Sequence, residues 1–332
     1  MNFHKSNIVL MAAIVLALCS SCERDPQPDE NGRTPLSFGM DISRTKGIIE
    51  NRTDLNNSGN RVVVFGSYQK GSDAPVSILS KNANSNGIEL YYSSGWKYDN
   101  TEYWEKNANH RFAAVYPSTG AGTPSFTVAT GELTLNCTAG LTKSSPDIMY
   151  SFNSRDLTQG NDFSPVPFEM NHACAAVEFM VINGSTKTIT NVGSPRLYGI
   201  YSKETATIPF NGTPTWTHSG AKLASNSEDY YTSGNVYDSM EPDDNIAHAK
   251  TLFTEGFMIV VPQDVNSNDD AKFTFNYTYN GTPKSPVFNL KGQNVKTWQP
   301  GRKYTYYITV HDDYITFRVS VKEWDVVESI LK

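Results

Sequence analysis

One acidic run in this sequence has the residue types of a calcium-binding loop. Oxygen-bearing side chains stand at every second position, at Asp264, Asn266, Asn268 and Asp270. A calcium loop of the common helix-loop-helix kind also needs a Gly at its sixth position and a Glu at its twelfth. Asp269 and Phe275 stand at those two positions instead. We therefore predict a solvated turn here, and no metal site in the chain.

Catalytic side chains in a recognisable arrangement are also missing from the sequence. The six histidines are scattered singly. After residue 22 there is no Gly-x-Ser-x-Gly, His-Glu-x-x-His, Cys-x-x-Cys or phosphate-binding glycine motif. His172 could be a base or a ligand, but without a partner motif a hydrogen-bonded histidine beside a strand is the favoured interpretation. We expect no enzyme activity and no cofactor.

A group of aromatic residues offers a different kind of site. Exposed aromatic rings can stack on sugars, but strand cores also use aromatic side chains, and composition does not separate the two. A cell-surface glycan-binding protein is therefore the alternative function, and it requires Trp96 and Trp104 to be exposed on one face. The group consists of Tyr91, Tyr92, Trp96, Tyr98, Tyr103 and Trp104.

Two further features concern modification. Asp238-Ser239-Met240 resembles the three-residue O-glycosylation signal of exported Bacteroidales proteins, which makes Ser239 a candidate glycosylation site. Beyond Cys22 the only cysteines are Cys137 and Cys174. Two cysteines are too few for a disulfide-built scaffold. Two buried thiols are the favoured interpretation, and one bridge in an oxidising envelope stays open.

The first 22 residues have the pattern of an export signal. Lys5 precedes the apolar run Ile8–Leu18, and small residues lead to Cys22. The run is shorter than the roughly 20 residues that a membrane-spanning helix needs. The segment resembles a bacterial lipobox, although Cys19 stands where such signals usually have Leu. This resemblance implies cleavage after residue 21 and lipidation of Cys22, with ordinary signal cleavage as the alternative.

The chain after Cys22 reads as a tether. Residues 23–35 are acidic and contain no apolar side chain except prolines, so we expect them to be extended and solvated. The whole chain carries 28 Lys and Arg against 34 Asp and Glu, a net charge of −6. An acidic protein without a visible basic patch is not expected to bind nucleic acid. Contact with the outer membrane is expected only through the lipid.

Residue periodicity predicts an all-β fold. In Leu36–Ser43 every even position is apolar and every odd one is polar or Gly, as in a strand with one buried face. Tyr304–Val310 and Ile315–Val321 alternate in the same way around Asp312-Asp313, which predicts a hairpin. Further strands are predicted at Arg61–Tyr68, Ile88–Tyr92, Arg111–Tyr116, Ser125–Leu135, Asp147–Phe152, Ala173–Ile182, Thr188–Leu197, Ala206–Phe210, Phe257–Val261, Ala271–Tyr279 and Val287–Leu290.

The turn-rich stretch Asn153–Pro167 is the best candidate for a domain boundary. Many short strands separated by turns favour antiparallel sandwiches. We predict a signal peptide over 1–21, a lipidated flexible tether over 22–35, and two tandem β-sandwich domains over 36–165 and 166–332. The boundary is placed to within about twenty residues.

Several segments, taken in order, resemble the fimbrillin-like lipoproteins of Bacteroidales. The resemblance implies two transthyretin-like sandwiches and a subunit of a cell-surface fimbria, with a role in adhesion. The segments that carry it are the lipobox, Leu36–Ser43, Arg61–Tyr68, Asp147–Tyr150, Phe168–Val177, Trp298–Tyr306 and Val319–Trp324.

The family resemblance also implies a mode of assembly. A trypsin-like or arginine-specific protease would cut after the first strand, at Arg44 or Lys46, and a neighbouring subunit would fill the vacated groove. The exchangeable strand would present Leu36, Phe38, Met40 and Ile42 to that groove. Expected partners are other fimbrial subunits in a homo- or hetero-polymer, the outer membrane through the lipid, and a host or glycan ligand. The short tail Asp325–Lys332 leaves stalk, tip, accessory and anchor roles open.

Overall fold

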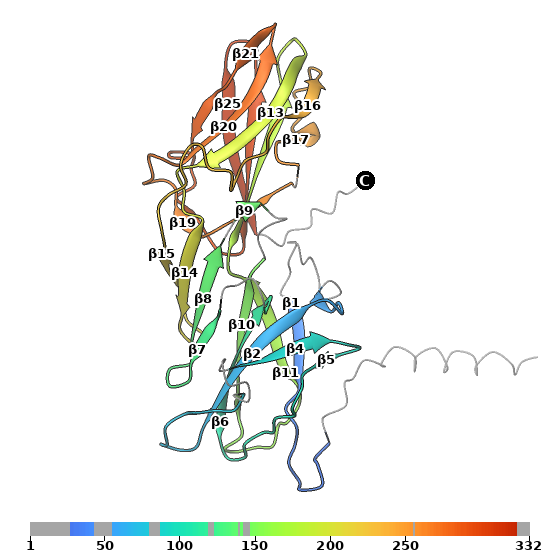
Figure 1. Cartoon of the computed structure of the whole chain (residues 1–332), viewed down its shortest axis with the longest axis vertical. Coiled ribbons are helices and arrows are strands. Elements are labelled where there is room, and N and C mark those ends of the chain that lie inside the picture. The colour runs from blue at the N-terminus through green and yellow to red at the C-terminus, as the bar shows by residue number, and fades with distance from the viewer. Residues whose placement is uncertain are drawn as a thin grey trace, which may run out of the picture.

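The computed structural model describes residues 27–42, 55–79, 87–118, 123–138, 140–141, 147–254 and 256–323. These residues form strands β1 to β25 and one short 3₁₀ helix, η2 (Ile246–His248), which confirms the all-β prediction. The molecule is elongated, with the sheet of the first strands at one end and the C-terminal strands at the other (Figure 1). No helix among the described residues is long and apolar enough to cross a membrane.

The first lobe is built on an eight-stranded sheet. Alternating apolar side chains along these strands bury both faces, so that the sheet contributes to two separate hydrophobic clusters. In hydrogen-bonding order the strands are β1 (Phe38–Ile42), β11 (Val166–His172), β10 (Met149–Asp156), β6 (Asn109–Tyr116), β2 (Arg61–Gln69), β4 (Gly87–Tyr92) and β5 (Trp96–Lys97), with β3 (Val76–Ser77) beside β2.

A four-stranded sheet covers one face of the first sheet and joins the two halves of the chain. Its order is β15 (Thr215–His218), β14 (Lys203–Ile208), β8 (Glu132–Thr138) and β7 (Ser125–Thr127). Leu133 and Leu135 of β8 and Ile208 of β14 share a buried cluster with Phe65 and Val115 of the first sheet. This sheet runs along the side of the molecule between the two lobes in Figure 1.

The C-terminal lobe encloses an aromatic core in which Phe179 stacks on Phe273 at 3.8 Å and on Tyr306 at 5.0 Å. One sheet has the order β25 (Ile315–Glu323), β24 (Arg302–Val310), β12 (Ala175–Asn183), β18 (Met258–Val260) and β9 (Gly140–Leu141), with β17 (Lys250–Thr251) beside β12. Its partner has β16 (Asn235–Met240), β13 (Ile189–Tyr198), β20 (Lys272–Tyr279) and β21 (Thr282–Lys284), with β22 (Val287–Asn289) beside β20. A separate two-stranded sheet consists of β19 (Gln263–Asp264) and β23 (Thr297–Trp298).

Most predicted strands are confirmed, and the differences have local causes. The single strand predicted over Ser125–Leu135 is wrong, because Gly131, with φ of +74°, turns the chain between β7 and β8. Strand β11 begins inside the stretch that we predicted to be turns. Two pairings, β1 with β11 and β12 with β24, are parallel, whereas the predicted sandwiches were antiparallel.

The division into two domains at residue 165 stays a prediction, and the strand pairings show how the chain crosses it. Strand β11 follows the predicted boundary but pairs within the first sheet. The hairpin β14–β15 also follows it, and β14 pairs with β8. In the other direction, β9 precedes the boundary and pairs with β18 of the C-terminal lobe. Each lobe therefore contains strands from both predicted domains.

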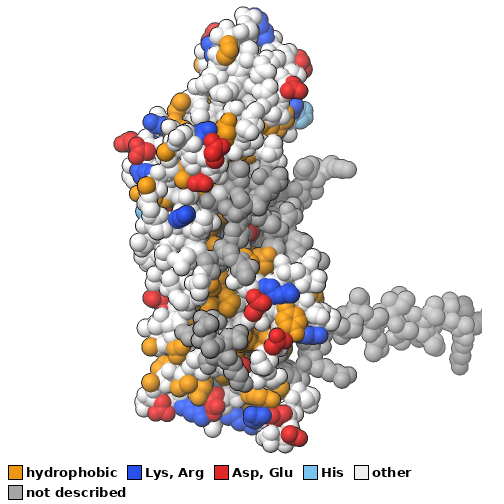
Figure 2. All heavy atoms as spheres, viewed as in Figure 1, with side chains coloured by type: hydrophobic (Ala, Val, Ile, Leu, Met, Phe, Trp, Pro, Cys, Tyr) orange, Lys and Arg blue, Asp and Glu red, His pale blue; other side chains and the backbone are white. Residues whose placement is uncertain are grey.

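Charged side chains of both signs are interspersed over the face of the molecule shown in Figure 2. Lys and Arg lie beside Asp and Glu at the end formed by the first lobe.

Candidate functional site

The strand β1 lies at one edge of the first sheet and occupies a groove. It runs parallel to β11, with Phe38 opposite Val166 and Ile42 opposite Met170. Because alternate side chains of a strand share a face, Leu36, Phe38 and Met40 point the same way. Their side chains belong to the core of the first lobe and are only 3%, 2% and 2% exposed. The side chain of Ile42 lies outside the described part of the structure.

An aromatic pocket holds Phe38 at the centre of this groove. Its ring centroid lies 6.1 Å from that of Phe168 on β11, 6.0 Å from Phe112 on β6 and 5.8 Å from Tyr98 after β5. Aromatic pairs at such distances contribute about 0.5–1.5 kcal/mol each beyond the burial of their area. These three ring contacts hold Phe38 in the core of the first lobe.

The residues just before β1 are held from the opposite side by a segment that we call the clasp, residues 98–104. The backbone N–H of Leu36 donates to the carbonyl of Glu102 at 2.8 Å, and that of Trp104 donates to the carbonyl of Thr34 at 3.0 Å. The Tyr98 hydroxyl donates to the carbonyl of Leu36 at 2.9 Å. Burial raises the pKa of Tyr98 to about 12, so this donor keeps its proton at neutral pH.

The two tryptophans proposed for sugar stacking have other neighbours. Trp104 is 5% exposed, and its ring meets those of His110 at 5.0 Å and Phe112 at 5.7 Å. Trp96 is half-buried, and its indole N–H donates to Asn56 Oδ1 at 2.9 Å. The exposure that glycan binding requires is therefore not met at Trp104. The sequence indicated these aromatic residues, but it did not indicate that Tyr98 and Trp104 belong to the clasp of residues 34–36.

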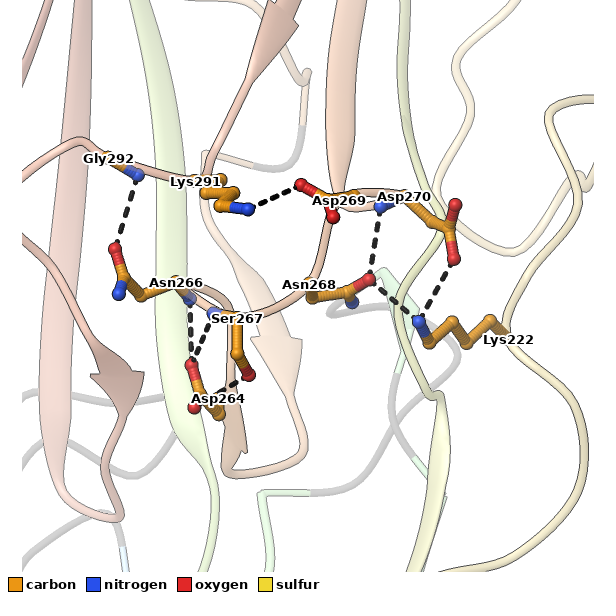
Figure 3. Close-up of polar contacts among 9 residues, drawn as sticks. All are labelled: Lys222, Asp264, Asn266, Ser267, Asn268, Asp269, Asp270, Lys291 and Gly292. Atoms are coloured by element: carbon orange, nitrogen blue, oxygen red, sulfur yellow. Dashed lines mark hydrogen bonds and ion pairs between the residues drawn. The ribbon is translucent and has the colours of Figure 1, made fainter.

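The acidic run 264–270 is an internally hydrogen-bonded turn (Figure 3). The Asp264 carboxylate accepts hydrogen bonds from the backbone N–H groups of Asn266 and Ser267 at 2.8 and 3.0 Å. Asp269 pairs with Lys291 at 2.6 Å and Asp270 with Lys222 at 3.0 Å. Lysine ammonium groups thus neutralise the carboxylates of Asp269 and Asp270. In the described part of the chain no group of His, Cys, Asp and Glu is placed to hold a metal ion.

His172 and the cysteines lie at the junction of the lobes. His172 ends β11, and its Nδ1 lies 2.7 Å from Asp147 Oδ1, with both side chains 1% exposed. The predicted hydrogen-bonded histidine is confirmed. Cys137 and Cys174 are free and buried, as the favoured interpretation expected.

The remaining predicted sites are not tested by these contacts. Ser239 is exposed on the edge strand β16, opposite Thr190, so that a glycan would meet solvent there. Glycosylation at Ser239 stays a prediction. Cys22, Arg44 and Lys46 lie outside the described residues.

Comparison with known proteins shows which family the chain resembles. The sequence matches the family model described as fimbrillin-like over residues 50–324. A fimbrial protein from Bacteroides vulgatus is 18% identical, with a TM-score of 0.55 over 87% of this chain and 99% of that one. A fimbrial assembly protein from Parabacteroides distasonis is 9% identical, with a TM-score of 0.38 over 87% of this chain and 100% of that one. No curated protein matches the sequence.

Proposed function

This chain belongs to the fimbrillin-like family, and from that premise we propose that it is a structural subunit of a cell-surface fimbria that assembles by exchange of its N-terminal strand. Its partners are other fimbrial subunits, as copies of itself or as different chains. The observation that supports this proposal best is the groove occupied by β1. One continuous segment, 34–42, fills a slot between the clasp and β11.

An empty groove would be unfavourable, because it would expose apolar surface and unpaired backbone groups to water. Each buried apolar side chain of this size contributes about 1.5–3 kcal/mol relative to exposure. Leu36, Phe38 and Met40 together therefore contribute several kcal/mol, against a typical domain stability of about 5–15 kcal/mol. Removing the segment also leaves backbone groups of β11 and of the clasp without partners. A strand from another subunit satisfies both needs at once.

The groove also defines what an incoming strand must look like. It must run parallel to β11 and antiparallel to the clasp at Tyr103, where Pro35 forms a bridge. It must place apolar side chains at alternate positions, with a ring or a side chain of similar size in the Phe38 pocket. These requirements distinguish a matching donor strand from an arbitrary extended peptide.

Limited proteolysis of the purified full chain tests the proposal. We expect trypsin to cut first at Arg44 or Lys46, because this stretch follows β1 and precedes polar chain. Clipped protein should then form higher-order species by size-exclusion chromatography with light scattering. Excess synthetic peptide of sequence 34–43 should keep the clipped protein monomeric.

Two matched controls make this test specific. A variant carrying Arg44→Gln and Lys46→Gln should stay uncut there and monomeric under the same treatment. A peptide with Phe38→Asp should fail to block association. Clipped protein that loses the whole segment up to Arg44 and remains a stable monomer would exclude strand exchange through this groove.

We further propose that the subunit reaches the surface as a lipoprotein. Cys22 would carry the lipid, and residues 23–35 would link it to the first lobe. Several acyl chains on one cysteine hold a protein on a membrane without a spanning segment, since each buried methylene adds about 0.8 kcal/mol of membrane affinity. After cleavage at Arg44 or Lys46, departure of the segment from the groove would release the lobes from the lipid and open the groove at the same time.

A further inference from the structure

Two thiols from distant parts of the chain meet inside the molecule. Cys137 is the last inward-facing residue of β8, after Leu133 and Leu135, and is 1% exposed. Cys174 lies between β11 and β12 and is fully buried. Both belong to the cluster between the first sheet and the four-stranded sheet, and the Cys137 side chain is the largest influence on the pKa of the Cys174 thiol, which it raises.

The location of this pair is unusual, because three sheets come together there. Cys137 belongs to the four-stranded sheet, where it stands opposite Glu204 of β14. Cys174 lies where the chain leaves the first sheet at His172 and enters the C-terminal sheet at Ala175. Its carbonyl accepts a hydrogen bond from the backbone N–H of Gly301 at 2.9 Å. A covalent link between the thiols would fasten all three sheets at one point.

Catalysis and metal binding do not account for the pair. The Cys137 side chain, together with burial, raises the pKa of the Cys174 thiol well above its usual range. The nucleophilic thiolate is therefore disfavoured in the folded protein. Among the residues that the structure describes, no group of His, Cys, Asp and Glu is placed to hold a metal ion here.

Both cysteines are free in the structure, and we propose that they are joined in a structural disulfide when the protein folds in the cell envelope. The thiolate of one cysteine attacks a disulfide carried by an envelope oxidant, a protein or small-molecule disulfide, and forms a mixed disulfide. The second thiolate then displaces the oxidant sulfur. The two cysteines lose two electrons and two protons, and the oxidant disulfide is reduced to two thiols.

The order of events follows from burial. An oxidant cannot reach side chains that are 0–1% exposed, so the bond must form before this core closes. For the same reason reductant should act on the bridge only after unfolding. A disulfide closing a loop of this length constrains the unfolded chain, and losing it should lower the melting temperature by about 5–10 °C.

Peptide mapping of wild-type protein tests the proposal directly. Envelope protein is precipitated in acid, denatured with N-ethylmaleimide in the absence of reductant, and digested with trypsin. Cys137 then lies in the peptide 112–143 and Cys174 in the peptide 156–187, because no Lys or Arg interrupts either one. We expect these peptides predominantly as one cross-linked species that reductant separates. Two peptides that both carry N-ethylmaleimide would overturn the proposal.

A refolding experiment tests the disulfide without relying on export of the protein to the envelope. The mature full-length chain is unfolded under reducing conditions and refolded in mixed oxidised and reduced glutathione, with Cys137→Ser as the matched control. The wild type should recover the cross-link and melt about 5–10 °C higher than when it is refolded in excess reductant. The variant should melt at the same temperature in both buffers. A wild type that refolds in the glutathione buffer with both thiols free, or shows no such difference, would overturn the proposal independently of where the protein is located.

Discussion

At the scale of single residues, Phe38 should decide how firmly β1 is held. Replacing Phe38 with Ala should lower the free energy of unfolding by about 3–5 kcal/mol, because three aromatic neighbours lose their partner and a cavity remains. Gly39→Ala is the matched control, since no atom lies within 4 Å of the added methyl group. Urea denaturation measures both variants. Equal stability of the two would contradict the pocket described here.

We expect His110 to make the stability of the first lobe sensitive to acid. It is 1% exposed, and burial lowers its pKa from 6.5 to about 4. The unfolded chain therefore binds a proton more readily than the folded one between these values. The free energy of unfolding that depends on neutral His110 is fully present above about pH 6.5. It is lost as the pH falls toward 4, by at most about 3 kcal/mol.

Urea midpoints between pH 7 and pH 4 should reveal this loss. His110→Phe removes the titrating group, so the fall in stability over this range should be smaller in the variant than in the wild type, whatever its absolute stability. Tryptophan fluorescence is a suitable readout, because the ring of Trp104 lies 5.0 Å from that of His110. An identical pH dependence in both proteins would exclude His110 as the cause.

Cys22 carries the proposed anchor, and its replacement should separate location from folding. Cys22→Ala should abolish labelling by a fatty-acid analogue and move the protein out of the membrane fraction. Cys19→Ala is the comparison, and it should keep both label and location. Label that persists in Cys22→Ala would assign the lipid to another residue.

Some single-residue roles were predictable from the sequence, and others depended on a distant partner. The alternation of Leu36, Phe38 and Met40 predicts a buried face wherever the strand docks, and their burial agrees. The function of Trp104 was not predictable, because a tryptophan beside polar residues suits both a surface and a core. Trp104 belongs to the clasp only because the folded chain brings residues 102–104 beside residues 34–36, which are far away in the sequence.

At the scale of elements, the strands that pair with their neighbours in sequence were the easiest to predict. β24 and β25 form the expected hairpin around Asp312-Asp313, because alternation and a local turn specify it completely. β11 was missed for the opposite reason. Pro165 and Pro167 suggest a turn. One edge of this segment pairs with β1, which is far away in the sequence. Parallel pairs of this kind leave no signal in the local pattern.

At the scale of the whole molecule, the shared sheets predict that the two halves of the chain cannot fold alone. Fragment 22–165 lacks β11, which supports β1, and β14, which pairs with β8. Fragment 166–332 lacks β9, and its β14 keeps β15 but has lost β8, the strand on its other side. Each fragment expressed alone should be aggregated or unfolded by circular dichroism and chromatography, whereas the full chain should unfold in one transition.

Co-expression of the fragments is the control for that prediction. The two pieces should associate and recover the melting behaviour of a chain cut at residue 165, since every missing strand is then supplied. Two soluble fragments that melt cooperatively by themselves would instead show that the crossing strands are dispensable, and would support independent sandwich domains.

The filled groove of the first lobe also has a consequence for symmetry and for fibre length. A groove on one copy that accepts a strand from another is a heterologous contact, and such contacts repeat into open helical filaments unless the rotation closes a ring. If exchange occurs as we propose, an uncut copy keeps its own segment in the slot between β11 and the clasp and cannot accept another strand. Each uncut copy would then terminate one filament end, so that the ratio of uncut to cut molecules would set the mean filament length.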